Sequence, residues 1–287
     1  MDYNRDVQYV RETFLYLRRV WYKLGLLALP AAVLLGFLIK PVSVITYLPS
    51  YAAASQKLGF GDILRLVAGD ATANTIFPPF LIFAVMLLTI GVMFSFIEKH
   101  FRIGRTLFQK SVVEINSYFL PALKTVVLVG GVMAVCYMLT ISGVTLQHAI
   151  FSGERIGPHP GSVVVASLWS LILTAVAVLV CSPLIFMIPL MQIYGYSFGE
   201  TFRMSLSYYG NNPIKITLGL VFGFAVTAAA GTAVAIIDVF VADWYWIRTL
   251  IYIALHLFLI VYVAAYCMVT TFSVTGMERK DEKKYGF

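Results

Sequence analysis

An all-α membrane protein with about six transmembrane helices is the fold class that the sequence predicts. Of the 287 residues, 60% are hydrophobic and only 12% are charged, and the mean hydropathy is +0.85. Soluble domains carry roughly 25% charged residues, so a chain this apolar needs lipid as part of its solvent. Its apolar stretches are long and lack the two-residue alternation of barrel strands, which leaves helices as the spanning elements.

Six stretches are long enough to cross a membrane, which takes about 20 apolar helical residues. The first is the weakest, because Lys40-Pro41 interrupts it, although the long Lys40 side chain can reach the head groups. We expect one integral membrane domain over the whole chain. The predicted spans are residues 24–44, 77–97, 120–146, 163–191, 214–241 and 246–273.

The basic residues orient these spans. The N-terminal segment, the 98–124 and 192–215 connections and the C-terminal tail together hold 16 of the 21 Lys and Arg residues, and the opposite side holds five. Basic segments stay on the cytoplasmic side of a membrane. We therefore expect a multi-pass protein of the cell membrane with both termini in the cytoplasm.

Amphipathic basic segments run directly into three of the predicted spans. They occupy residues 12–23, 105–116 and 200–211, and each has a Thr near its start and a Pro soon after its end. The pattern fits three units, each made of a cytoplasmic interfacial helix and a transmembrane hairpin. Such leaders are common before spans, so whether the chain is a true threefold repeat stays open.

Small residues recur every fourth position in the fifth predicted span, at Gly219, Gly223, Thr227 and Gly231. This spacing puts them on one side of a helix, where they let a second helix backbone approach closely. We interpret them as a helix-packing surface. The pattern does not distinguish a partner helix within this chain from one in another subunit.

One segment matches the nucleophile elbow of the α/β-hydrolases. Gly195-Tyr-Ser-Phe-Gly199 fits G-x-S-x-G, but that motif has meaning only between a strand and a helix of a sheet. Ser197 and Glu200 also form S-x-x-E, which is typical of a capping box. We predict that Ser197 caps a helix beginning at residue 198.

Two ionisable residues lie inside predicted spans, His256 in the sixth and Asp238 near the outer end of the fifth. Such residues are costly in a membrane and are functional candidates. The alternatives are that Asp238 reaches head-group water and that His256, uncharged, shares a hydrogen bond with a neighbouring helix. We expect no metal site, no catalytic pair of carboxylates and no cofactor, since nucleotide-binding motifs are also missing from the sequence.

The basic segment after the second predicted span is the candidate binding surface, with Arg102, Arg105 and Lys110. Basic residues beside spans attract anionic lipid head groups. No basic stripe interleaves with aromatic residues as nucleic-acid binding requires, so nucleic acid is not an expected partner. We expect the lipid bilayer as one partner and leave a protein partner or a second copy of the chain open.

The segment from Tyr196 to Asn212 resembles a loose group of bacterial six-span membrane proteins. That group includes the membrane domain fused to some glycerophosphodiester phosphodiesterases. The likeness covers roughly 20 residues, and Thr201 stands where the group usually has Ala. The resemblance implies a bacterial membrane protein with six spans and brings no catalytic residues.

A second likeness is to the ABC-2 type permeases, which also have six spans and a coupling helix between spans two and three. Residues 98–107 occupy that position here. They lack a convincing Glu-Gly-Thr pattern, and the short link between the last two spans leaves little room for the re-entrant helices of that family.

Three functions follow from the sequence. The first is a non-enzymatic scaffold or accessory subunit that docks a partner or anionic lipid on its cytoplasmic face. The second is the permease subunit of an ABC-2 type exporter, working in transport with a separate ATPase. The third is an intramembrane enzyme that uses His256, Asp238 or the outer histidines His148 and His159.

Overall fold

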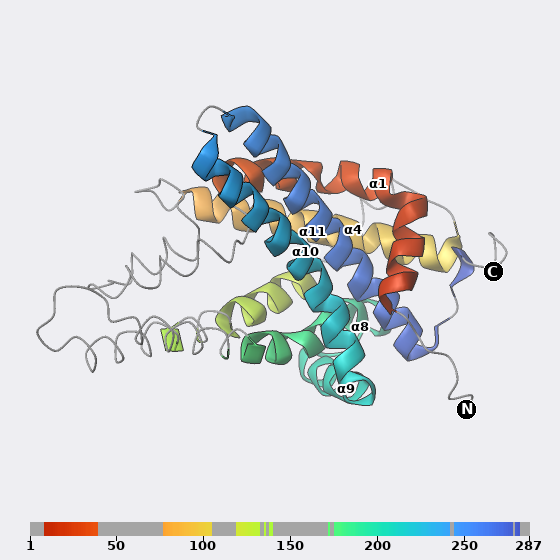
Figure 1. Ribbon diagram of the computed structural model, residues 1–287. Helices are drawn as coiled ribbons and strands as arrows, with labels where there is room; N and C mark the ends of the chain where they lie inside the picture. The colour runs from red at the N-terminus through yellow and green to blue at the C-terminus, as the bar shows by residue number, and fades with distance from the viewer. Residues whose placement is uncertain are drawn as a thin grey trace, which may run out of the picture.

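In the computed structural model of the chain, every regular element of the described residues is a helix (Figure 1). Five of these helices are long and apolar enough to cross a membrane, as in a multi-pass membrane protein. The predicted all-α fold class is therefore confirmed for this part of the chain. The structure describes residues 9–39, 77–104, 119–132, 135, 138–139, 172, 175–241, 244–277 and 279–281.

The helices follow one another with few breaks where the chain is described. A further apolar helix, Phe119–Val132, has no label in Figure 1, and η1 is a 3-10 segment within the helical stretch Ala175–Tyr194. In chain order the elements are α1 (Tyr9–Leu38), α4 (Phe77–Ile103), η1 (Ser182–Phe186), α8 (Met187–Tyr194), α9 (Phe198–Asn211), α10 (Pro213–Phe240) and α11 (Tyr245–Thr275).

Five of the six predicted spans overlap long apolar helices in the structure. The third, 120–146, is described as a continuous helix only over Phe119–Val132, so a sixth span stays a prediction. The first ends earlier than predicted, because α1 stops at Leu38 instead of residue 44. The residue before a proline avoids the helical conformation, which explains a helix that ends ahead of Lys40-Pro41.

The two described leader segments differ in shape. In α1 the amphipathic segment continues without a break into the apolar part, and Figure 1 shows the helix bending along its length. The third leader, α9, ends at Asn211 and is separated from α10 by the single residue Asn212, as its Gly-Asn-Asn-Pro sequence predicts. The second leader lies outside the described residues. The threefold repeat therefore stays a prediction.

Helices α1 and α11 run antiparallel along their whole length. Near one end Ser273 donates a hydrogen bond to Glu12 at 2.8 Å. Near the other, a Cβ atom added to Gly36 would lie 3.0 Å or less from the backbone of Ile253. Only glycine permits so close an approach of the two backbones.

Helix α4 completes a three-helix core with α1 and α11. The Phe101 ring, near the end of α4, makes edge-on contacts with Tyr16 of α1 at 4.8 Å and with Phe272 of α11 at 4.9 Å between ring centroids. All three rings are at most 1% exposed. Edge-to-face aromatic pairs of this kind add to the stabilisation from burial alone.

Helices α10 and α11 form the hairpin that the sequence predicts, and the small-residue surface of α10 faces α11. The Tyr262 hydroxyl donates to the Gly219 carbonyl and the Tyr266 hydroxyl donates to the Ile216 carbonyl, both at 2.7 Å. A Cβ atom at Gly223 would lie 2.4 Å from the Tyr262 ring. The packing role of Gly219 and Gly223 thus has a partner within this chain.

The other two members of that predicted surface are also inward-facing. The Thr227 hydroxyl donates to the Gly223 carbonyl of its own helix at 3.1 Å, and both Thr227 and Gly231 are buried. A hydroxyl satisfied by its own helix costs little to bury in an apolar interface.

The helical stretch before α9 changes from α-helix to 3-10 helix at a proline. At Pro183 the chain turns into η1, and the Met187 N–H bonds the Leu184 carbonyl instead of the Pro183 carbonyl. The Ser205 hydroxyl of α9 donates to the Pro183 carbonyl. The tighter 3-10 turn is therefore coupled to the docking of α9.

Candidate functional site

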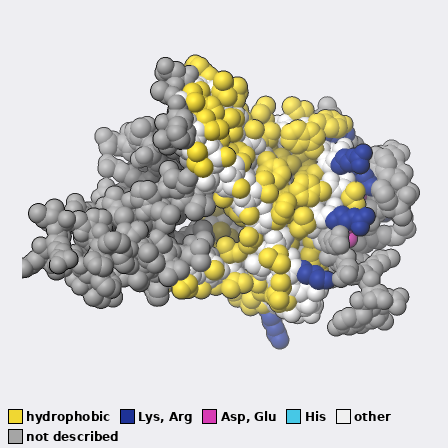
Figure 2. All heavy atoms as spheres, viewed as in Figure 1, with side chains coloured by type: hydrophobic (Ala, Val, Ile, Leu, Met, Phe, Trp, Pro, Cys, Tyr) yellow, Lys and Arg dark blue, Asp and Glu magenta, His cyan; other side chains and the backbone are white. Residues whose placement is uncertain are grey.

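Most of the charged side chains that the structure describes gather at one end of the bundle, and Arg248 lies at the other end. The end where they gather, which we call the basic end, is where α4 and α11 finish and α10 begins. Figure 2 shows the dark-blue Lys and Arg side chains grouped beyond a broad hydrophobic band, at the right of the view. The exposed basic residues there are Arg11, Arg18, Arg102, Arg203, Lys215 and Lys280.

The acidic side chains at the basic end are all engaged within the chain. Glu12 accepts from Ser273 at 2.8 Å, and Glu98 pairs with Arg102 at 2.8 Å. Glu200 accepts from the Ser197 backbone at 2.9 Å, and Asp281 pairs with Arg279 at 3.0 Å. These four are the acidic residues whose side chains the structure describes. Among the described side chains at this end, exposed basic residues therefore outnumber exposed acidic ones, of which Glu200 is the single example.

The C-terminal tail folds back onto the basic end. Helix α11 ends at Gly276, which has a left-handed backbone with φ of 67°. The Met277 N–H then bonds the Phe272 carbonyl at 3.1 Å, the bond that closes a Schellman motif. This turn reverses the chain and directs the tail between α1 and α4.

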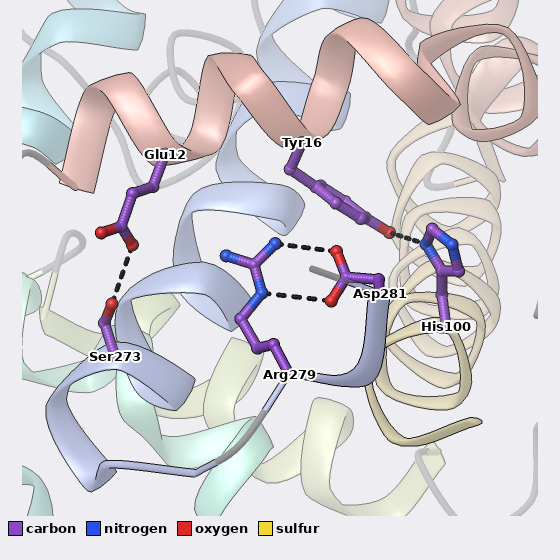
Figure 3. Close-up of polar contacts among 6 residues, drawn as sticks. All are labelled: Glu12, Tyr16, His100, Ser273, Arg279 and Asp281. Atoms are coloured by element: carbon purple, nitrogen blue, oxygen red, sulfur yellow. Dashed lines mark hydrogen bonds and ion pairs between the residues drawn. The ribbon is translucent and has the colours of Figure 1, made fainter. Parts of the chain in front are cut away.

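The tail brings an ion pair into an aromatic slot (Figure 3). Arg279 bonds Asp281 through two nitrogens, Nε at 3.3 Å and Nη2 at 3.0 Å. Its guanidinium carbon lies 4.3 Å from the Phe101 ring centroid and 5.8 Å from that of Tyr16. Stacking a guanidinium on aromatic faces is favourable, more so when water is removed. We call Arg279 and Asp281 the tail clip.

Both charges of the tail clip come from the tail itself. Arg279 is 8% exposed and Asp281 is fully buried, so a charge left alone there would be costly. Each ion has its counterion within the tail, and the Tyr16 and Phe101 rings of the slot lie beside the guanidinium. Gly104, with φ of 71°, allows the close approach, since a Cβ there would lie 3.3 Å from the Lys280 carbonyl oxygen.

A second polar contact joins α1 to α4 beside the clip. The Tyr16 hydroxyl points toward His100 in Figure 3 and lies 3.4 Å from its Nδ1. His100 is 3% exposed. The site thus combines a tyrosine, a histidine and an ion pair, but nothing on the described residues shows a substrate cavity among them.

The predicted pair His256 and Asp238 is not assembled into a site by the described residues. The His256 Nδ1 lies 2.8 Å from the Tyr252 carbonyl of its own helix, instead of bonding a neighbouring helix as one alternative expected. The side chain of Asp238 lies outside the described part of the structure. Their functional roles stay predictions.

Of the predicted basic surface, the structure describes Arg102. Its guanidinium is largely exposed and pairs with Glu98 one helical turn earlier. Arg105 and Lys110 lie outside the described residues. The structure adds Arg11 and Arg18 of α1, which are both exposed.

Ser197 is a helix cap, as predicted. Its hydroxyl accepts from the Glu200 N–H, and the Glu200 carboxylate in turn accepts from the Ser197 N–H at 2.9 Å, so a full capping box begins α9 at Phe198. The G-x-S-x-G match has no hydrolase context in this all-helical arrangement. The hydrogen bonds from the Ser197 side chain and backbone hold the pKa of the Glu200 carboxyl below its ordinary value of 4.5.

Because of this capping box, we expect the stability of α9 to depend on pH. A lowered folded-state pKa means that Glu200 stabilises α9 above its ordinary pKa, and that this contribution is lost as the pH falls through the folded value. In Ser197→Ala the first turn of α9 should lose protection at neutral pH. Hydrogen exchange corrected for intrinsic rates measures both effects, and equal protection of the wild type and Ser197→Ala would contradict them.

Tyr208, on the packed side of α9, has its pKa raised by burial and by the nearby Tyr194 and Tyr196 hydroxyls. It therefore stays uncharged at physiological pH. Among the described residues, no group of three or more His, Cys, Asp or Glu side chains is placed to hold a metal ion.

Sequence reasoning missed the tail clip. The signal was present in the glycine after α11 and in the alternating charges that follow it, but such a run is ordinarily solvated. The aromatic slot that receives the clip comes from two helices far apart in sequence. Comparison with known proteins gives no match to a family model, to a curated protein or to a solved structure.

Proposed function

We propose that this chain is a non-enzymatic membrane scaffold or accessory subunit whose basic end faces the cytoplasm and binds anionic lipid head groups. The observation that carries the proposal is the one-sided charge of that end. Six exposed Lys and Arg side chains face outward there, whereas Glu200 is the one exposed side chain among the acidic residues that the structure describes. The positive-inside rule gives the orientation.

The N-terminal half of α1 is the best-formed part of this surface. Arg11 and Arg18 are seven residues apart and so share one side of the helix, with exposed Leu15 and Tyr22 between and beyond them. Basic groups next to apolar and aromatic groups suit the boundary between head groups and hydrocarbon. Lipid is therefore a better match to this surface than a soluble acidic protein.

The test compares lipid affinities of purified protein with and without the basic side chains. In Arg11→Gln/Arg18→Gln/Arg102→Gln, affinity for phosphatidylglycerol should fall by about 1 kcal/mol for each residue at low salt, a roughly fivefold loss each. The loss should shrink as salt is added. Native mass spectrometry or titration with a fluorescent lipid measures it.

Arg248→Gln provides the matched control, because Arg248 lies at the opposite end of α11 and stacks on Tyr245. Its affinity for phosphatidylglycerol should equal that of the wild type. An unchanged affinity in the triple variant, or an equal loss in Arg248→Gln, would reject the proposed lipid surface.

The permease and enzyme functions stay predictions, and no contact of the described residues favours either. Co-purification of an ATPase with the tagged chain would support the permease. Loss of a measurable activity in His256→Ala with unchanged expression would support the enzyme.

A further inference from the structure

Helix α9 has an exposed apolar stripe that no described residue covers. The stripe consists of Phe198, Phe202 and Leu206, which are 38%, 40% and 45% exposed. They are four residues apart, and a helix turns once in about 3.6 residues, so they form one line along its surface. Exposed aromatic and aliphatic side chains arranged in this way require an apolar neighbour.

The other two sides of α9 are occupied differently. Thr201 and Ser205 are fully buried, and Ser205 is bonded to the Pro183 carbonyl of η1. Arg203 and Ser207 are exposed. Going around the helix, the side packed on η1 is followed by the apolar stripe and then by the polar side.

This order is what a helix needs where protein, hydrocarbon and water meet. A helix lying in the membrane surface buries its apolar side about 5–10 Å below the head groups and keeps its charged side in water. Here the packed side rests on the bundle, and the apolar stripe lies between it and the polar side.

Exposed apolar side chains continue from α9 into the start of α10. Directly after the Asn212 break, Ile214 and Leu218 of α10 are 72% and 62% exposed. The apolar part of α10 is long enough to cross a membrane. The Tyr209 hydroxyl lies 2.8 Å from the Thr217 hydroxyl, which ties the end of α9 to this part of α10.

We propose that α9 is a membrane-inserted interfacial helix, with Phe198, Phe202 and Leu206 in the acyl boundary of the leaflet and Arg203 among the lipid phosphates. The proposal rests on the proposed function only in assigning the basic end to a lipid surface. The element that contacts lipid in this proposal is the apolar stripe of α9, whereas the proposed function rests on the exposed basic residues. An inserted α9 would hold the start of α10 at a fixed depth in the leaflet.

Spin labels on the full-length protein in phosphatidylcholine nanodiscs test this placement. Single cysteines replace Phe202, Leu206 or Ser207 in a chain whose three native cysteines are alanine. Oxygen concentrates in hydrocarbon and a nickel chelate in water. Labels at 202 and 206 should therefore collide more with oxygen than with the chelate, and the label at 207 should show the reverse.

Every other pattern overturns the proposal. More collisions with the chelate at 202 and 206 would place the stripe in water, and low collision rates with both reagents would place it under a second copy or another protein. Because these nanodiscs carry no net charge, the result is independent of the anionic-lipid affinity that tests the proposed function.

Two variants with native cysteines give a second measurement. Leu206→Asp would place a charge in the acyl boundary and should lower the melting temperature in nanodiscs, whereas Ser207→Asp, one residue away on the polar side, should leave it unchanged. Equal melting temperatures for the two variants would contradict insertion.

Discussion

Gly219→Ala is expected to destabilise the α10–α11 hairpin by about 2–4 kcal/mol, a large effect for one methyl group. The added Cβ would lie 2.3 Å from the Tyr266 hydroxyl oxygen and within 2.6 Å of two ring carbons. The ring is fully buried, and its hydroxyl is bonded to the Ile216 carbonyl. It cannot move without losing that hydrogen bond and its packing.

The melting temperature in detergent, followed by the fraction of protein that stays monodisperse, measures this loss. Gly199→Ala is the matched control, because nothing lies within 4 Å of a Cβ there and alanine is the better helix former. Its melting temperature should be unchanged or higher. A Gly219→Ala protein as stable as the wild type would show that the two helices are not packed in this way.

A double-mutant cycle at the neighbouring contact identifies the partner residue. Gly223→Ala meets the Tyr262 ring at 2.4 Å, so combining it with Tyr262→Leu should cost less than the sum of the two single changes. Strict additivity would mean that the partner of Gly223 is another helix, in this chain or in a second copy.

The glycine surface shows how far sequence alone reaches in this protein. The four-residue spacing of Gly219, Gly223, Thr227 and Gly231 is a local property, so it predicts a packing surface, and at Gly219 and Gly223 the Tyr266 and Tyr262 rings lie against it. It carries no information on the opposing residues. Tyr262 and Tyr266 lie about 40 to 50 positions later and look like ordinary apolar-span residues until the hairpin brings them to the glycines.

At the basic end, too, local features were predictable and contacts between distant segments were not. The capping box of Ser197 and Glu200 is complete within four residues and was predictable, as was the break at Asn212 before Pro213. The pairing of Tyr16 with His100 joins positions 84 apart, and no pattern in either segment indicates the other. The tail clip could not be predicted for the same reason, because the slot that receives it is built from α1 and α4, which are far from the tail in the sequence.

Function was less predictable than fold because the spans carry few polar groups. His256 was a candidate on the ground that an ionisable residue in a membrane needs a reason. Its bond to the Tyr252 carbonyl is reason enough for the ring to be tolerated in α11. The exposed charges at the basic end are therefore the stronger indication of where this protein meets its surroundings.

Asp281→Asn is expected to release the tail from the basic end. Arg279 would keep its charge at 8% exposure without the carboxylate that accepts two of its hydrogen bonds. Breaking a buried ion pair by removing one partner costs about 3–5 kcal/mol when the other stays buried. Here the tail is a chain end, so leaving the slot lets Arg279 regain water.

Hydrogen exchange of the full-length protein distinguishes release from global unfolding. In Asp281→Asn the amides of residues 277–281 should exchange faster, and so should those of the α4 end at 100–104. The rest of α11 should keep its protection. Lys280→Gln is the control, because Lys280 is exposed and its side chain lies outside the clip.

The double change Arg279→Met/Asp281→Leu separates the contributions of charge and shape. A methionine can lie against the Phe101 ring as the guanidinium does, and replacing a buried ion pair by apolar groups of similar size is often neutral or stabilising. The tail should then stay docked, with protection at 277–281 close to that of the wild type. A released tail in the double variant would show instead that the ion pair itself, and not the fit to Tyr16 and Phe101, holds the chain end in place.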